Sequence, residues 1–187
     1  MIKLIGLSGS LRKQSYNTAL LRAAASVLPT GASLEVQTIE GIPLYNEDVE
    51  DTLGVPAVVS ALKDAIAAAD GLVLSTPEYN NSIPGAFKNA IDWLSRPNDD
   101  IARVFRGKPV AVMGVSAGPF GTVLSQAAWW PILRTLGTDP YWGDRLLVGK
   151  GGQVFGENGE LLDAHTREHL KKFVGSFITF AAARVRK

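Results

Sequence analysis

Hydrogen-bond donors are concentrated in one short stretch near the start of the chain, G-S-L-R-K-Q-S-Y-N at residues 9–17. Ser10 and Ser15 carry hydroxyls, Arg12 carries a guanidinium and Asn17 carries a side-chain amide. The stretch lies between an apolar β-type run and a helical pattern, so its backbone N–H groups are expected at a helix N-terminus, where anions bind. This donor set suits a dianionic phosphate monoester. The same residues also suit ordinary helix capping, with Arg12 in solvent.

The spacing of glycines limits which phosphate ligand the stretch would hold. It lacks the G-x-G-x-x-G spacing that lets a pyrophosphate approach the backbone, and no G-x-x-x-x-G-K-[ST] occurs in the chain. A dinucleotide or a nucleoside triphosphate is therefore disfavoured as the tightly held ligand.

A second polar stretch, P-E-Y-N-N-S-I-P-G at residues 77–85, follows the apolar run G-L-V-L-S-T. Its prolines, Pro77 and Pro84, restrict the backbone at both ends. Tyr79 offers a ring face and Asn80 an amide, which suits a flat heterocycle. Ser82 is expected to cap the following helix, with Pro84 in its first turn. Taken alone, the pattern is equally typical of an ordinary turn between a strand and a helix.

Alternating strand and helix patterns must position these two stretches. Short β-type apolar runs occupy residues 3–7, 34–38, 72–75, 110–115 and 146–148, and helical patterns occupy residues 18–28, 56–69, 85–94, 122–136 and 165–183. The alternation predicts a parallel sheet covered by helices on both faces, an α/β three-layer sandwich. In the doubly wound strand order 2-1-3-4-5, the first and third strands are neighbours, so both polar stretches would flank one crevice.

Composition narrows the class of protein. A chain of 187 residues, 46% of them hydrophobic, is expected to form one domain over residues 1–187. The net charge of +1 gives no reason to expect nucleic acid or a membrane as partner. With no cysteine, disulfides, thiolate metal ligands and thiol nucleophiles are excluded. The apolar start is too short for a signal peptide and no run approaches about 20 apolar residues, so a cytoplasmic location is expected.

Two further motifs offer other chemistry. G-V-S-A-G at residues 114–118 fits the nucleophile elbow of a serine esterase, with Ser116 as nucleophile, an acid from Asp139, Asp144 or Asp163, and His165 or His169 as base. No HGGG-type oxyanion loop is present, and that function would leave the first polar stretch unexplained. H-T-R-E-H at residues 165–169 fits a zinc pattern, but its neighbours Arg167, Lys171 and Lys172 favour a solvated helix surface.

At these residues the sequence resembles a known family. L-R-K-Q-S-Y-N matches an L-R-x-x-S-x-N phosphate signature, and T-P-E-Y-N-N-S-I-P-G-A-F-K-N-A-I-D-W-L-S-R-P is similar to the corresponding block of the NADPH-dependent FMN reductases, which include bacterial quinone and chromate reductases. The resemblance implies a flavodoxin-like fold with a five-stranded parallel sheet and one non-covalent FMN. It also implies NADPH or NADH as electron donor, and two-electron reduction of quinones, other flavins, azo or nitro compounds, or chromate.

The resemblance also implies roles for individual residues. The phosphate would be held by Ser10, Arg12, Ser15 and Asn17, and the isoalloxazine ring by Pro77, Glu78, Tyr79 and Asn80, with Ser116 completing the pocket. No side chain is required for catalysis, because the cofactor performs the redox chemistry. A non-enzymatic electron carrier is the alternative use of the same pocket, but flavodoxins are typically acidic and this chain is not.

Relatives form dimers or tetramers with the flavin near the subunit boundary, so a homodimer or homotetramer is expected. Trp93, Trp129 and Trp130 would suit either such a surface or the core.

Overall fold

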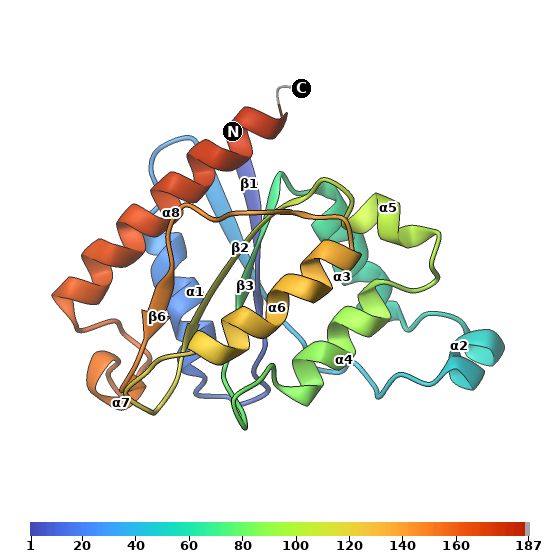
Figure 1. Cartoon of the computed structure of the whole chain (residues 1–187), viewed down its shortest axis with the longest axis horizontal. Helices are drawn as coiled ribbons and strands as arrows, with labels where there is room; N and C mark the ends of the chain where they lie inside the picture. The colour runs from blue at the N-terminus through green and yellow to red at the C-terminus, as the bar shows by residue number, and fades with distance from the viewer. Residues whose placement is uncertain (186–187) are drawn as a thin grey trace.

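A parallel sheet forms the centre of the molecule in the computed structural model, which describes residues 1–185 (Figure 1). Its strand order is β2-β1-β3-β4-β5, which confirms the predicted order. The first four strands are β1 (Ile2–Ser8), β2 (Ala32–Thr38), β3 (Gly71–Ser75) and β4 (Pro109–Val115). Every residue of β3 and β4 is buried, as expected for apolar strands with helices on both faces.

The fifth position of the sheet is shared by two short strands, β5 (Asp139–Pro140) and β6 (Leu146–Val148), which both pair with β4. Only residues 146–148 were expected there. The backbone N–H of Tyr141 donates to the carbonyl of Val110 at 2.8 Å, and the chain then leaves the sheet until Leu146. A two-residue strand that includes a proline carries no recognisable strand pattern, which is why β5 was missed.

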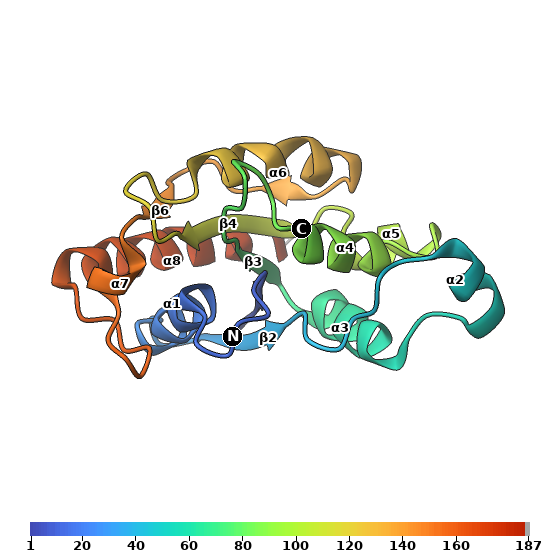
Figure 2. The same ribbon diagram turned by 90° about the horizontal axis from the view of Figure 1, so that it is seen from below.

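Five longer helices cover the sheet. The helices α1 (Tyr16–Ser26) and α8 (Ala164–Val185) pack on one face, whereas α3 (Ala57–Ala68), α4 (Gly85–Leu94) and α6 (Val123–Thr135) pack on the other. Figure 2 shows α1 and α8 on one side of the sheet and α3 and α4 on the opposite side. The apolar residues accordingly form two core clusters, one for each face.

Three short helices were not predicted: α2 (Glu47–Leu53), α5 (Asp100–Val104) and α7 (Gly151–Val154). Helix α2 buries no residue and therefore has no apolar stripe to recognise. Its N-terminus is instead stabilised by the side chain of Asn46, which accepts a hydrogen bond from the backbone of Asp48 at 2.9 Å.

The tryptophans are divided between core and surface. Trp93 and Trp129 are fully buried, so they belong to the core rather than to an exposed surface. Trp130 is half-buried and stacks on Trp142, which is 67% exposed, with ring centroids 4.2 Å apart. Within residues 1–185, no helix has both the length and the apolar character needed to cross a bilayer.

Candidate functional site

The phosphate loop, residues 9–17, runs from the end of β1 into the first turn of α1 at the carboxyl edge of the sheet (Figure 1). The backbone N–H of Gly9 donates to the carbonyl of Ser75 at 2.9 Å, which carries the chain past the end of β3. A Cβ atom at Gly9 would lie 2.0 Å from the ring of Phe87, so only glycine allows the loop to pass so close to α4. The loop is thereby held against both β3 and α4.

The two serines of the phosphate loop are oriented as donors. The hydroxyl oxygen of Ser10 accepts from the backbone N–H of Arg12 at 3.3 Å, and that of Ser15, the N-cap of α1, accepts from Thr18 at 3.2 Å. Each hydroxyl hydrogen therefore remains available to a ligand. Within residues 1–185, the N–H groups of residues 13–15 donate to no protein acceptor. This set of donors at a helix N-terminus fits a phosphate group.

Arg12 supplies the positive charge of the phosphate loop. Its guanidinium carbon lies 5.8 Å from the centre of the Tyr16 ring, and the side chain is exposed. In the part of the chain that the structure describes, no carboxylate forms an ion pair with Arg12. Its charge is thus available to an anionic ligand.

Asn17 points inward, toward β3 and β4. Its amide nitrogen donates to the carbonyl of Val115 at 2.9 Å, and its amide oxygen accepts from the N–H of Val115 at 3.0 Å and from the hydroxyl of Ser75 at 3.1 Å. These bonds leave one amide hydrogen without a protein partner. A role for Asn17 in holding phosphate stays a prediction, and it would rest on that hydrogen alone.

The ring loop, residues 77–84, is a tight turn between β3 and α4. Tyr79 and Ser82 exchange two backbone hydrogen bonds of 3.1 Å, and Asn80 and Asn81 between them have φ angles of 50° and 61°. Positive φ at both central positions is the requirement of a type I′ turn, which asparagine tolerates. The prediction of a Ser82 cap was wrong: Ser82 closes this turn, and Pro84 precedes α4 without a side-chain cap.

Glu78 and Thr76 bind the start of this loop to α6. The carboxylate of Glu78 accepts from the backbone N–H groups of Leu124 at 2.8 Å and Ser125 at 2.9 Å. The hydroxyls of Thr76 and Ser125 are 2.8 Å apart. The carboxylate of Glu78 thus points toward the N-terminus of α6, and the lining of the ring by Glu78 stays a prediction.

The loop after β4 lies against the same elements. The N–H of Ser116 donates to the carbonyl of Val148 at 3.0 Å, and its hydroxyl donates to the carbonyl of Gly118 at 3.2 Å. A Cβ atom at Gly114 would lie 2.2 Å from the carbonyl oxygen of Thr76 and 2.4 Å from the hydroxyl oxygen of Thr122. Close packing of three segments therefore explains the first glycine of G-V-S-A-G.

The histidines lie on α8. His169 is 3.6 Å from Asp144, and His165 is exposed. Within residues 1–185, neither histidine is hydrogen-bonded to Ser116, and no cluster of histidines and carboxylates could hold a metal ion. The contacts of Ser116 are those of a loop residue and not those of an activated nucleophile.

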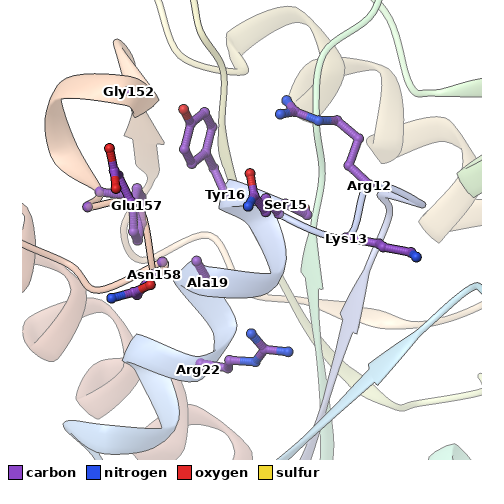
Figure 3. Close-up of a pocket in the computed structure, with 13 residues that line it drawn as sticks. Arg12, Lys13, Ser15, Tyr16, Ala19, Arg22, Gly152, Glu157 and Asn158 are labelled. Atoms are coloured by element: carbon purple, nitrogen blue, oxygen red, sulfur yellow. The ribbon is translucent and has the colours of Figure 1, made fainter.

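Two cavities meet at Arg12. A small, mostly apolar one of about 270 Å³ is lined by Gly9, Leu11, Arg12, Tyr79, Pro84, Gly85 and Ala86. A polar one of about 590 Å³ opens beside the start of α1, where Arg12, Lys13, Ser15 and Tyr16 face residues 152–159 (Figure 3). The structure thus places Arg12 and Tyr79 on one cavity and Arg12 and Ser15 on the other. Ser10, Asn17 and Ser116 line neither.

The wall formed by residues 152–159 was not predicted as part of a site. Figure 3 shows Gly152, Glu157 and Asn158 across from Tyr16. Tyr16 stacks on Phe155 with ring centroids 5.8 Å apart, which joins this wall to α1. The sequence G-E-N-G-E at residues 156–160 is typical of a local turn, and its distance from the phosphate loop along the chain hides the contact.

Comparison with known proteins gives concordant matches. Residues 2–151 match the family model described as NADPH-dependent FMN reductase. An NAD(P)H-dependent FMN reductase of Pseudomonas aeruginosa is 44% identical over 171 residues, covering 91% of this chain and 90% of the relative. A quinone reductase of Escherichia coli K12 is 39% identical over 191 residues, covering 96% and 95%.

A solved structure agrees with the matches to these sequence relatives. The flavoenzyme NAD(P)H:acceptor oxidoreductase FerB of Paracoccus denitrificans is 32% identical, with a TM-score of 0.86 over 98% of this chain and 99% of that one. The family model covers most of the chain, and the relatives are matched over nearly their whole length. The chain therefore belongs to the NADPH-dependent FMN reductase family.

Proposed function

We propose that this protein is an FMN-dependent NAD(P)H oxidoreductase that transfers two electrons to quinones. The observation that carries the proposal is the junction at Arg12, where a donor-rich helix N-terminus meets an apolar cavity bordered by Tyr79. A mononucleotide has the matching two ends, a dianionic phosphate and a flat ring. Family membership and the names of the relatives support the same activity.

The residues present fit FMN. Ser10, Ser15 and Arg12 would hold the phosphate with the free N–H groups of residues 13–15, and Asn17 would contribute its remaining amide hydrogen. Tyr79 and Pro77, with the backbone of Glu78 and Asn80, would border the ring, and Ser116 would close the far side. Bound FMN would supply the redox chemistry.

The protein's own contribution is orientation and binding. Arg12 offsets the phosphate charge, while the turn at Asn80 and Asn81 holds Tyr79 at the cavity edge. Few polar groups border the small cavity, so flat oxidants of varied structure can be accepted there. Other flavins, azo and nitro compounds and chromate are further proposed oxidants, and either NADPH or NADH serves as donor.

The purified protein tests this function directly. We expect a flavin absorbance band, FMN in the supernatant after mild denaturation, and oxidation of NADPH or NADH that depends on added benzoquinone. A colourless protein that takes up no FMN at any concentration would contradict the proposal. FMN binding without NAD(P)H oxidation would instead indicate an electron carrier.

The serine esterase alternative makes the opposite prediction for Ser116. An esterase would lose all turnover in Ser116→Ala, because the nucleophile is removed. A flavin reductase should keep most of its quinone reductase turnover in the same variant. Neither the comparisons nor the contacts of Ser116 favour the esterase.

Self-association, domain organisation and location complete the proposal. We propose a homodimer or homotetramer, supported by exposed apolar side chains beside α6, where Phe120 is 81% exposed and Trp142 is 67% exposed. Light scattering should give a mass that is a multiple of 20.0 kDa, and Trp142→Ser should lower that mass.

One continuous sheet supports a single domain over residues 1–187, of which the last two lie outside the described residues. A cytoplasmic location is proposed because NAD(P)H is available there.

A further inference from the structure

The N-terminus of α6 is capped by a side chain from a distant part of the chain. Thr122 holds the N-cap position but makes no side-chain cap bond. Its hydroxyl instead accepts a hydrogen bond from the side-chain amide of Gln126 at 3.1 Å. The N–H groups of Leu124 and Ser125, which an N-cap side chain would normally satisfy, are bound by the carboxylate of Glu78.

This cap crosses between two segments of the candidate site. Glu78 lies in the ring loop, one residue before Tyr79, whereas α6 follows the loop that contains Ser116. The contact between the hydroxyls of Thr76 and Ser125 reinforces the same junction. Since Glu78 uses one oxygen for both bonds, its side chain is fixed and the backbone beside it is fixed with it.

The side chain of Glu78 points toward α6. Its Oε2 atom accepts both hydrogen bonds from α6, and Glu78 does not line the cavity that Tyr79 borders. The carboxylate also offsets the partial positive charge at the start of a 13-residue helix. Two physical effects, bond geometry and charge, are therefore combined in one group and can be separated by substitution.

We infer that Glu78 is a positioning residue: by capping α6 in place of Thr122, its carboxylate holds the backbone of the ring loop in the conformation that binds the isoalloxazine ring. The inference rests on the proposed function, since it concerns the same FMN site. It assigns the acidic residue of P-E-Y-N to the protein's internal scaffold.

Three substitutions of Glu78 separate the effect of side-chain length, which sets how far the carboxylate reaches, from the effect of its charge. Glu78→Gln keeps the length and an oxygen acceptor but removes the charge, whereas Glu78→Asp keeps the charge and shortens the reach by one methylene. Glu78→Ala removes both. Asn46→Ala is the matched control, because it deletes a side-chain cap from α2, away from the candidate site.

The measurements are the Kd of FMN for the apoprotein, by quenching of flavin fluorescence, and the thermal unfolding of each apoprotein. We expect Glu78→Ala and Glu78→Asp to raise the Kd by about tenfold, equivalent to about 1.4 kcal/mol, and Glu78→Gln by less than about threefold. Asn46→Ala should lower the unfolding temperature without changing the Kd. In the loaded enzyme, the absorbance band of bound FMN should shift in Glu78→Asp and stay unchanged in Glu78→Gln.

The reverse order of the FMN Kd values among the Glu78 variants would overturn the inference. If Glu78→Asp binds FMN as the wild type does and Glu78→Gln is impaired, the charge matters and the reach does not. An unchanged Kd in Glu78→Asp and Glu78→Ala would also overturn the inference. If Glu78→Ala fails to fold, the Kd of Glu78→Gln compared with that of Glu78→Asp tests the inference. Failure of the proposed function can be distinguished from failure of the inference about Glu78, because in the first case the wild-type apoprotein itself would not bind FMN.

Discussion

Asn17 and Val115 form a two-way hydrogen-bonded pair, in which the side-chain amide of Asn17 both donates to and accepts from the backbone of Val115. The pair joins the start of α1 to the end of β4, 98 residues further along the chain. Asn17 is 4% exposed and Val115 is 2% exposed, so these bonds are shielded from solvent in the folded protein. The phosphate loop is thereby anchored to the centre of the sheet.

Replacing Asn17 by alanine should destabilise the fold. The buried N–H and C=O groups of Val115 would both lose their partner, at a cost of about 2–4 kcal/mol in the free energy of unfolding. Urea denaturation followed by circular dichroism measures this change. Asn98→Ala, at an exposed asparagine, should change the same quantity by less than about 0.5 kcal/mol. A loss of similar size in both variants would contradict the anchoring role of Asn17.

Replacing Arg12 by alanine should weaken FMN binding. A charge-assisted hydrogen bond contributes about 1.5–3 kcal/mol, so the Kd of FMN should rise about tenfold or more, and equilibrium dialysis of the apoprotein measures it. Arg106→Ala serves as control, because Arg106 is an exposed arginine that precedes β4 at the opposite edge of the sheet. An unchanged Kd in Arg12→Ala would remove Arg12 from the phosphate site.

The two glycines of G-V-S-A-G should respond differently to alanine. Gly114→Ala would force a methyl group against Thr76 and Thr122 and should cost about 1–3 kcal/mol or more of stability. At Gly118 the nearest atom to an added Cβ is 3.9 Å away, so Gly118→Ala should be tolerated. Thermal unfolding of the two variants tests the difference. Equal tolerance at both positions would show that Gly114 is not held by packing.

Acid unfolding should depend on Asp100. Hydrogen bonds from Arg103 and Lys63 lower the pKa of Asp100 from 3.8 to about 2. Because the folded-state pKa is the lower one, the stabilisation is fully present above about pH 4 and is lost as the pH falls toward 2. Unfolding temperatures between pH 2 and 7 should therefore fall less steeply with acid in Asp100→Asn.

The neighbouring Asp99 provides the control for Asp100. Asp99 is exposed and makes no side-chain cap bond, so Asp99→Asn should follow the wild-type pH profile. Asp100→Asn should also be less stable at neutral pH, because Lys63, with a side chain 3% exposed, loses its counter-ion. Parallel pH profiles for the wild type and Asp100→Asn would contradict the ion-pair assignment.

Strong periodicity in the sequence predicted several helices and strands, and the signature motifs predicted the family. Helix α4 was placed at its observed bounds of residues 85–94, and the apolar runs located β1, β3 and β4, whereas the correct strand order came from the doubly wound fold that the resemblance implies. The directions of Asn17 and Glu78 could not be predicted in this way. Both residue types suit a ligand as well as a helix terminus, and their actual partners lie 98 and 46 residues away along the chain.

The interruption between β5 and β6 bears on how the protein behaves in concentrated solution. An unbroken outer strand would offer a row of free N–H and C=O groups to another sheet, which is a route to fibrils. Here the border is divided between β5, of two residues, and β6, of three, and β5 includes Pro140, which has no N–H to offer. At the opposite border, β2 exposes the charged side chain of Glu35 midway along its length. Neither border of the sheet is therefore a good template for edge-to-edge aggregation.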